Sequence, residues 1–179
     1  MNRHFGAVRQ VGFVVADIKR AMGHWSSVLG VGPWFYREEV GVTEFSYYGK
    51  PSELPRMSIA LANSGSLQLE LIQQTNDAPS LFLDSLKKSG DVAQHVAYWT
   101  ENEYDSWGRK LLASGYVEGH SGRMGLRGRF SYYAHPDLPS CIIEISELRG
   151  GKDAYFKQVA EAALVWDGSD PIRDAPAKR

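Results

Sequence analysis

Four polar residues stand inside apolar, strand-like segments of this 179-residue chain. They are Gln10 in VRQVGFVV, Glu70 in LQLELIQ, His95 in QHVAYW and Glu144 in SCIIEIS. A buried carboxylate without a partner costs several kcal/mol or takes up a proton, so the two glutamates require a cation. A divalent metal ion balances both charges, and imidazole and amide oxygen complete four protein ligands with positions left for water or substrate. The alternative is a metal-free network of hydrogen bonds among these side chains.

The spacing of these residues follows an internal repeat. Three features recur at one offset of 85 positions: a polar residue in a strand, a helix N-cap, and a glycine that ends the helix. The pairs are Gln10 and His95, Asp17 and Asn102, and Gly30 and Gly115. Three independent matches at one offset indicate a duplicated unit. Glu70 and Glu144 match at an offset of 74, which assigns about eleven extra residues to the first copy, in the polar loop YYGKPSELP. Surface loops tolerate such insertions.

Each copy reads as a β-α-β-β-β module. The first helix has apolar residues at helical spacing between Asp17 as N-cap and Gly30 as stop, and the second lies between Asn102 and Gly115. Alternating, β-branched and aromatic runs predict the later strands of both modules, within residues 34–48, 56–63, 67–73, 115–121, 129–134 and 140–146.

The expected fold is α+β, in which the two modules form a cupped mixed sheet with helices outside, plus a C-terminal helix. We expect a single domain over residues 1–179. Its parts are module 1 (about 8–75), a linker with a short helix (76–91), module 2 (about 92–148), and a C-terminal helix and tail (149–179). The tail from Asp167 is polar and contains two prolines, which predicts a frayed end.

Strand alternation places the four polar residues on one surface. Successive strand side chains point to opposite faces, so Gln10 shares a face with Val14, while Val11, Phe13 and Val15 share the other. The same rule separates Glu70 from its leucine neighbours. It also puts His95 and Glu144 on a face with Ala97, Trp99 and Ile142. Four such residues on one concave face would converge.

Composition narrows the partners. Twenty basic and 21 acidic residues leave a net charge near zero, which argues against nucleic acid or an anionic membrane as partner. No stretch approaches the roughly 18 apolar residues of a membrane span, so a cytoplasmic protein is expected. We interpret the single cysteine, Cys141, as a small core residue because it begins an apolar run. The remaining histidines are expected to face solvent: His4, His24, His120 and His135.

These segments resemble the vicinal oxygen chelate superfamily, which contains glyoxalase I, methylmalonyl-CoA epimerase, extradiol dioxygenases and the bleomycin and fosfomycin resistance proteins. The resemblance covers residues 8 to about 148, including VRQVGFVVADI, LGVGPW, LQLELIQ, AQHVAYW and SCIIEIS. It implies paired modules around a divalent metal, and in many members a homodimer. The metal-ligand pattern maps onto Gln10, Glu70, His95 and Glu144, a set that is similar to that of eukaryotic-type glyoxalase I.

The resemblance implies a divalent-metal-dependent isomerase, epimerase or lyase of glyoxalase type. Such an enzyme removes a proton next to a carbonyl of a small α-oxo or acyl substrate, through an enediolate. Glu144 is the first candidate for the base and Glu70 the second. The metal is Zn, Ni, Co, Mn or Mg, and the residues do not distinguish among these.

Two other classes remain open on the same fold. One is a metal-free small-molecule binding or resistance protein, in which the four polar residues only hydrogen-bond a ligand. The other is an extradiol-type ring-cleaving dioxygenase. It ranks lower because such enzymes hold iron with two histidines and one carboxylate, whereas the four positions here include one histidine.

Aromatic and arginine residues supply candidates for contacts to the substrate. An aromatic-lined cup suits a substrate with an apolar part. Arginines in the glycine-rich segment GRMGLRGRF would hold a carboxylate, a phosphate or a coenzyme A tail. The candidates are Trp34, Phe45, Tyr47, Trp99, Arg123, Arg127, Phe130 and Tyr132.

Overall fold

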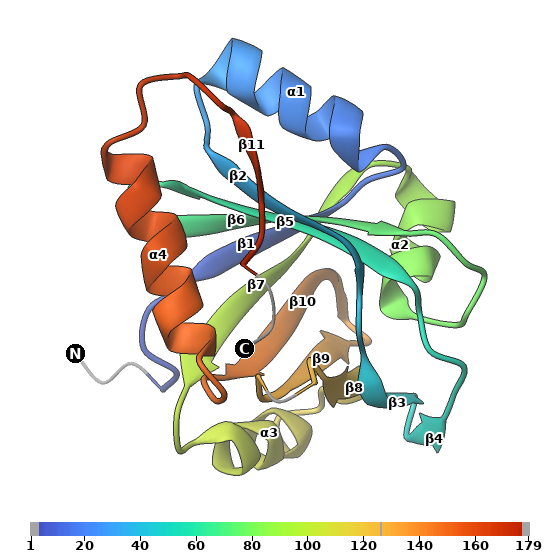
Figure 1. The fold of residues 1–179 in the computed structure, drawn as a ribbon. Helices are drawn as coiled ribbons and strands as arrows, with labels where there is room; N and C mark the ends of the chain where they lie inside the picture. The colour runs from blue at the N-terminus through green and yellow to red at the C-terminus, as the bar shows by residue number, and fades with distance from the viewer. Residues whose placement is uncertain (1–3, 126, 177–179) are drawn as a thin grey trace.

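The computed structural model describes residues 4–125 and 127–176. In the first half, the elements are β1 (Gln10–Val14), α1 (Ile18–Leu29), β2 (Trp34–Val40), β3 (Thr43–Tyr47), β4 (Lys50–Pro51), β5 (Met57–Ser64) and β6 (Leu67–Gln74). In the second half they are α2 (Leu81–Ser89), β7 (Val92–Thr100), α3 (Tyr104–Ala113), β8 (Val117–Arg123), β9 (Arg129–His135), β10 (Leu138–Glu147), α4 (Lys152–Leu164) and β11 (Ile172–Asp174). The α+β class with two β-α-β-β-β modules is confirmed (Figure 1).

The eleven strands of the described residues form one mixed sheet, in the order β11-β2-β5-β6-β1-β7-β10-β9-β8-β3-β4. Within the modules, β1 runs parallel to β6 and β7 runs parallel to β10. The modules join where β1 pairs with β7 in antiparallel fashion. This junction makes β6, β1, β7 and β10 direct neighbours, so the strands that carry Gln10, Glu70, His95 and Glu144 form the centre of the sheet.

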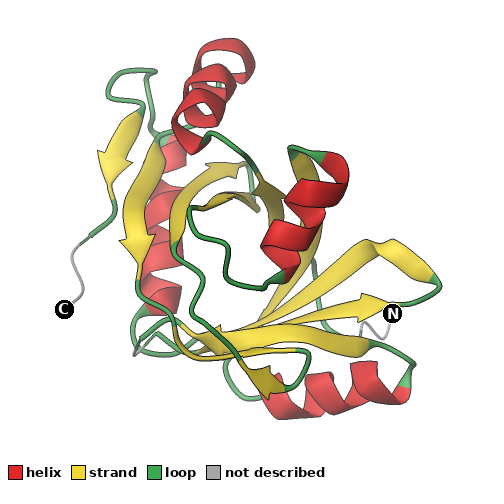
Figure 2. Ribbon diagram, turned by 90° about the vertical axis from the view of Figure 1, so that its right-hand side faces the viewer, coloured by secondary structure: helices red, strands yellow, loops and turns green. Residues whose placement is uncertain are grey.

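The segment expected as one strand over residues 34–48 is divided between the two ends of the sheet. β2 pairs with β5, whereas β3, which follows after Gly41 and Val42, pairs with β8. Glu39 and Glu44 have positive φ angles of 49° and 53°, and the ladder is irregular at both places. The sheet therefore curls into a cup and stays open, and Figure 2 shows the curl of its strands.

The first helix of each module covers the convex face of the sheet. α1 packs Ile18 and Met22 against Leu69 and Leu71 of β6. As predicted, Asp17 caps α1, because its carboxylate accepts the Arg20 N–H at 2.9 Å, and Gly30 ends it in the left-handed region. α3 packs in the same way on β9 and β10.

The start of α3 differs from the expectation that Asn102 caps it. The helix begins at Tyr104, and the residue before it, Glu103, makes no capping hydrogen bond through its side chain. Instead, Thr100 Oγ1 accepts the N–H groups of Asn102 and Glu103. Thr100, at the end of β7, thus satisfies two N–H groups that precede the helix, and the expectation that Asn102 caps α3 is wrong.

The other two helices pack on the concave side. Phe82 of α2 belongs to the core cluster of Val14 and Ile72, and Val159 of α4 packs on Phe35 and Leu61. The helix expected in the linker is therefore part of the core. α4 lies against the sheet (Figure 1), and its residues Lys152 and Tyr155 line the same cavity as Gln10 and Glu70.

Two sequence expectations at the surface are corrected. Residues 172–174 of the tail form β11, a strand parallel to β2, and residues 177–179 lie outside the described part. Cys141 is exposed, so the core assignment is wrong; it lies where the pairing of β10 with β9 is interrupted, between Leu138 and Ile143. None of the described helices has the length and apolar character of a membrane span.

Candidate metal centre

Three of the four expected ligands meet at the centre of the sheet. Glu70 comes from β6, His95 from β7 and Glu144 from β10, and all three are buried. His95 Nε2 lies 3.4 Å from Glu70 Oε2 and 3.4 Å from Glu144 Oε2. One donor atom from each residue lies within 4.8 Å of the others.

The donor set and its spacing suit a divalent ion. Ligand atoms at about 2.0–2.1 Å from a tetrahedral zinc ion are about 3.3–3.4 Å apart, which matches the separations from His95 Nε2. Two carboxylates balance the charge of such an ion, and carboxylate and imidazole ligands are shared by several divalent metals. The cluster can therefore hold a divalent metal, although the donor types do not select one.

A β-bulge and an amide orient the imidazole of His95. The pairing of β1 with β7 passes from Gly12–His95 to Phe13–Ala93, so Gln94 is an extra residue that turns inward beside His95. Gln94 Nε2 donates to the Leu81 carbonyl at 2.7 Å and to Ser85 Oγ at 2.9 Å, which leaves Gln94 Oε1 at 3.0 Å from His95 Nδ1.

In this network Nδ1 of His95 carries the proton and Nε2 faces the carboxylates, an arrangement common among metal-bound histidines. Sequence reasoning missed Gln94, because strict strand alternation puts it on the opposite face from His95. A polar residue next to the histidine was the only available signal.

The three ionisable groups shift one another's pKa values. Burial alone would lower the pKa of His95, but hydrogen bonds to Glu144 and Glu70 raise it to about 9. Burial raises the pKa of Glu70, and its hydrogen bond to His95 only partly opposes this. Burial alone would also raise the pKa of Glu144, but the hydrogen bond to His95 and the charge of His95 outweigh burial and lower this pKa. Without a metal, a charged His95 therefore links the two acidic groups.

Tyr132 connects the cluster to its surroundings. Its hydroxyl donates to Glu144 Oε2 at 3.2 Å and lies 3.4 Å from His95 Nε2. Burial, followed by the charges of Glu144 and Glu70, raises the pKa of Tyr132, so the phenol keeps its proton. The tyrosine therefore holds the Glu144 carboxylate in place.

The fourth expected ligand, Gln10, is buried on the same face as Glu70. Its Nε2 donates at 2.8 Å to Oε1 of Gln68, the residue directly opposite it on β6. This bond leaves the amide oxygen of Gln10 as its remaining polar atom. In the described part of the chain, Gln68 Nε2 has no hydrogen-bond partner. Gln68 was missed because its strand contains a more conspicuous polar residue, Glu70.

Gly12 makes room for His95. In the sheet register Gly12 lies opposite both Glu70 and His95. A Cβ added at Gly12 would lie 1.8 Å from Cε1 and 2.1 Å from Nε2 of His95. The imidazole thus occupies space that any other residue at position 12 would fill.

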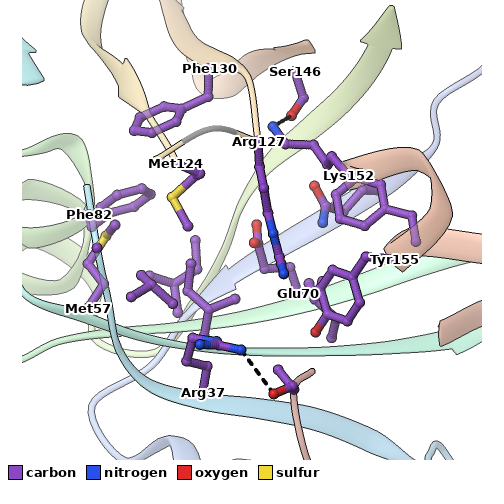
Figure 3. Close-up of a pocket in the computed structure, with 18 of the residues that line it drawn as sticks. Arg37, Met57, Glu70, Phe82, Met124, Arg127, Phe130, Ser146, Lys152 and Tyr155 are labelled. Carbon is purple, nitrogen blue, oxygen red and sulfur yellow. Dashed lines mark hydrogen bonds between the residues drawn. The ribbon is translucent and has the colours of Figure 1, made fainter. Parts of the chain in front are cut away.

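A cavity opens beside Glu70, between the sheet and α4 (Figure 3). One side is apolar and includes Met57, Phe82, Met124 and Phe130. Across from it are the basic side chains of Arg127 and Lys152, and a third basic residue, Arg37, lies at the bottom of the view. Glu70 is the acidic residue among the described residues that line it.

Of the eight residues expected to contact substrate, Arg127, Phe130 and Tyr132 line this cavity. Trp34 points to the convex side, where it is fully buried with its ring centroid 6.0 Å from that of Trp25. Trp99 packs on Phe156 at 4.4 Å, beside a separate hollow near Arg9. Neither tryptophan is among the described residues that line the cavity beside Glu70.

The other three expected contacts are engaged elsewhere. Phe45 is a core residue, 5.5 Å from the ring of His120. Tyr47 donates to Asp84 at 2.7 Å, and Arg123 forms an ion pair with Glu44 at 3.2 Å. Residue type alone did not separate these roles, because the break between β2 and β3 decides which side chains reach the cavity.

His120 contradicts the expectation that it faces solvent. It is fully buried next to Phe82 and Tyr132, with ring centroids at 4.5 and 4.4 Å. Its Nδ1 accepts the Leu81 N–H at the start of α2, at 3.1 Å. Burial, followed by the charge of His95, lowers the pKa of His120 to about 3. The histidine is therefore a neutral part of the core.

This burial predicts a stability that depends on pH. The folded pKa of about 3 lies below the unfolded value of about 6.5, so the unfolded state takes up a proton first as pH falls. The contribution of His120 is complete above about pH 6.5 and is lost toward pH 3, at up to about 1.4 kcal/mol per pH unit.

Denaturant unfolding between pH 7 and 4 measures this loss. The variant His120→Asn, which keeps an acceptor for Leu81 but does not titrate, is expected to show a shallower decline than the unaltered protein. Equal slopes would contradict a neutral, buried His120.

Comparison with known proteins agrees with this geometry. The chain combines a curled sheet of two β-α-β-β-β modules with a buried Glu-His-Glu cluster that could hold a divalent metal ion. The family model described as Glyoxalase/Bleomycin resistance protein/Dioxygenase superfamily matches residues 9–133. The chain belongs to this superfamily. No curated protein matches the chain by sequence.

Solved structures show the same fold at low identity. Methylmalonyl-CoA epimerase from Mycobacterium tuberculosis is 19% identical, with a TM-score of 0.58 over 86% of this chain and 97% of that chain. A variant of the Streptomyces coelicolor methylmalonyl-CoA epimerase, in complex with 2-nitronate-propionyl-CoA, is 16% identical, with a TM-score of 0.52 over 79% of this chain and 96% of that one.

A mutant of 4-hydroxymandelate synthase from Streptomyces coelicolor is 15% identical, with a TM-score of 0.52, and the match covers 79% of this chain and 38% of that chain. At these identities the likenesses establish the fold alone.

Proposed function

We propose that the protein is a divalent-metal-dependent isomerase, epimerase or lyase that removes a proton next to a carbonyl of a small α-oxo or acyl substrate. The observation that carries the proposal is the convergence of Glu70, His95 and Glu144 from both modules beside a cavity. The epimerase structures with this fold support the choice of reaction class, as does the superfamily itself.

The proposed metal ligands are Gln10, Glu70, His95 and Glu144. When bound, the ion supplies a positive charge that lowers the energy of the enediolate formed as the α-proton leaves. The metal is Zn, Ni, Co, Mn or Mg. Gln94 positions the imidazole of His95, and Tyr132 holds the carboxylate of Glu144.

The cavity favours Glu70 over Glu144 as the base. The resemblance puts Glu144 first, but Glu70 is the one that lines the cavity, whereas Glu144 accepts a hydrogen bond from Tyr132. A base must come within hydrogen-bond reach of the proton that it removes. Glu70 is therefore proposed to take the α-proton, and Glu144 to remain a ligand.

Metal analysis of protein purified without chelator tests the proposal. We expect about one divalent ion per chain. We also expect deuterium to enter C3 of 2-oxobutanoate in D₂O, with the exchange lost after chelation and restored by the ion. Protein that takes up no ion, yet binds small molecules, would contradict the proposal and support the metal-free binding module. Iron-dependent oxygen uptake with a catechol would instead support the dioxygenase.

A homodimer and a cytoplasmic location stay predictions from the sequence. Light scattering at several protein concentrations would give the oligomeric state. The substrate is a small molecule in this proposal, and the methylmalonyl-CoA named in the related structures is one candidate for it.

A further inference from the structure

The cavity beside Glu70 is divided into an apolar and a basic side. The apolar side contains Met57, Ile59, Ile72, Phe82, Met124 and Phe130. Facing it are the side chains of Lys152 and Arg127, and Figure 3 shows Arg127 reaching between Glu70 and Tyr155. A molecule that fills the cavity must therefore satisfy both kinds of surface.

Lys152 is a buried cation with few partners. Its residue is 6% exposed, and its Nζ donates to Ser146 Oγ at 2.9 Å. Within the described part of the chain, Lys152 forms no ion pair, although an ammonium group has three donors. A buried lysine is rare unless it is paired, so an acceptor on the cavity side of Lys152 would stabilise it.

The second basic group across from the apolar side is Arg127. Its guanidinium lies 5.0 Å over the ring of Tyr155. Of the residues that the structure describes, no acidic side chain forms an ion pair with it. The third basic group, Arg37, donates to the carbonyls of Ala175 and Pro176 and is held by the tail. Arg127 and Lys152 are thus the basic groups free to receive a ligand.

The charged groups of the cavity also favour an anion as its ligand. Glu70 is the acidic residue that shares the cavity with these cations, and its carboxylate is engaged by His95, at 3.4 Å, in the metal-free protein and by the metal in the proposed function. Among the residues that the structure describes, neither Arg127 nor Lys152 forms an ion pair with a carboxylate. Burial lowers the pKa of Lys152, the charges of Glu144, Glu70 and Glu147 oppose this, and the charge of Arg127 adds to the lowering. An anion between the two groups would relieve both the burial and the repulsion.

We propose that Lys152 and Arg127 form an anion subsite that selects substrates carrying a carboxylate on a short apolar chain. The carboxylate lies between the two basic groups, and the apolar part lies against Met57, Ile72 and Phe82. This subsite rests on the proposed function only in its assignment to a substrate, because carboxylate binding does not require the reaction.

Titration of metal-free protein with butanoate and with butanamide, followed by NMR chemical shifts, tests the subsite. The metal is removed so that it cannot bind the carboxylate. We expect butanoate to bind at least tenfold more tightly than butanamide, which has the same shape without the charge. Lys152→Met and Arg127→Gln should each weaken butanoate binding about tenfold or more, the range expected for a hydrogen bond to a charged group.

Two matched variants serve as controls. Lys157→Met removes an exposed lysine of the same helix, which pairs with Glu161, and Arg123→Gln removes an arginine of the same hairpin, which pairs with Glu44. Both should bind butanoate as the unaltered protein does. Should Lys152→Met fail to fold, Arg127→Gln decides alone, because its side chain lies at a loop.

Equal binding of butanoate and butanamide, or unchanged binding in both site variants, would overturn the subsite. If the protein neither binds metal nor catalyses the exchange, but still binds butanoate in a way that depends on Lys152, only the proposed function is overturned. If the protein binds metal and catalyses the exchange, but neither site variant weakens butanoate binding, only the subsite is overturned.

Discussion

Replacement of Glu70 by Gln is expected to slow deuterium exchange at C3 of 2-oxobutanoate by about 10²- to 10⁴-fold, the usual contribution of a general base. Glu70 lines the cavity, while the amide that replaces it accepts no proton at neutral pH. The rate is measured at saturating metal, because the substitution also removes a charged ligand. Metal content is determined on the same samples, so that loss of the ion and loss of the base are separated.

Glu144→Gln is the matched comparison for this prediction. This variant removes the other carboxylate of the cluster. Glu144 lies at the same 3.4 Å from His95 Nε2 as Glu70 does, but its carboxylate accepts a hydrogen bond from Tyr132. Both variants should weaken metal binding. At saturating metal, Glu144→Gln should retain more of the exchange rate than Glu70→Gln. The reverse order would assign the base to Glu144, as the sequence resemblance implies.

Replacement of Gly12 by Ala is expected to disrupt the centre without changing any proposed ligand. The new Cβ would lie 1.8 Å from the imidazole of His95, and the ring cannot remain where it is. Loss of groups that orient a metal ligand typically costs 10- to 100-fold in metal affinity, and we expect at least about this loss. Overpacking a core also lowers stability by about 1–3 kcal/mol. Calorimetric titration with the metal and denaturant unfolding measure the two effects.

Gly23→Ala is the control for this substitution. Gly23 lies inside α1, and a Cβ there meets no atom within 4 Å. Alanine is favoured over glycine in a helix interior by about 0.5–1 kcal/mol, so this variant should be slightly more stable and should bind metal normally. A Gly12→Ala protein that binds metal as tightly as Gly23→Ala would show that His95 is not a ligand.

The order of residues along the chain was enough to predict the paired modules and their inward-facing polar residues. Strand alternation separates Glu70 from Leu69 and Leu71, and the structure places the leucines under α1 and the glutamate in the cavity. These features depend on local geometry, since side chains of a strand alternate wherever the strand is placed. The cap at Asp17 and the stop at Gly30 were predictable for the same reason.

Contacts between distant segments decided the rest, because they depend on packing that no local pattern encodes. Trp34 and Phe130 look alike in sequence, yet only Phe130 reaches the cavity, since β2 turns its tryptophan toward α1. Lys152 is a helix residue far from the repeats, and it becomes part of the site only because α4 packs on the concave face.

The inward turn of Gln94 depends in the same way on a bulge in the pairing of β7 with β1. The sequence therefore determined the modules and the polar residues of the centre. The tertiary structure decided which groups orient them and which face the cavity, because strand pairing and helix docking bring together residues that no spacing connects.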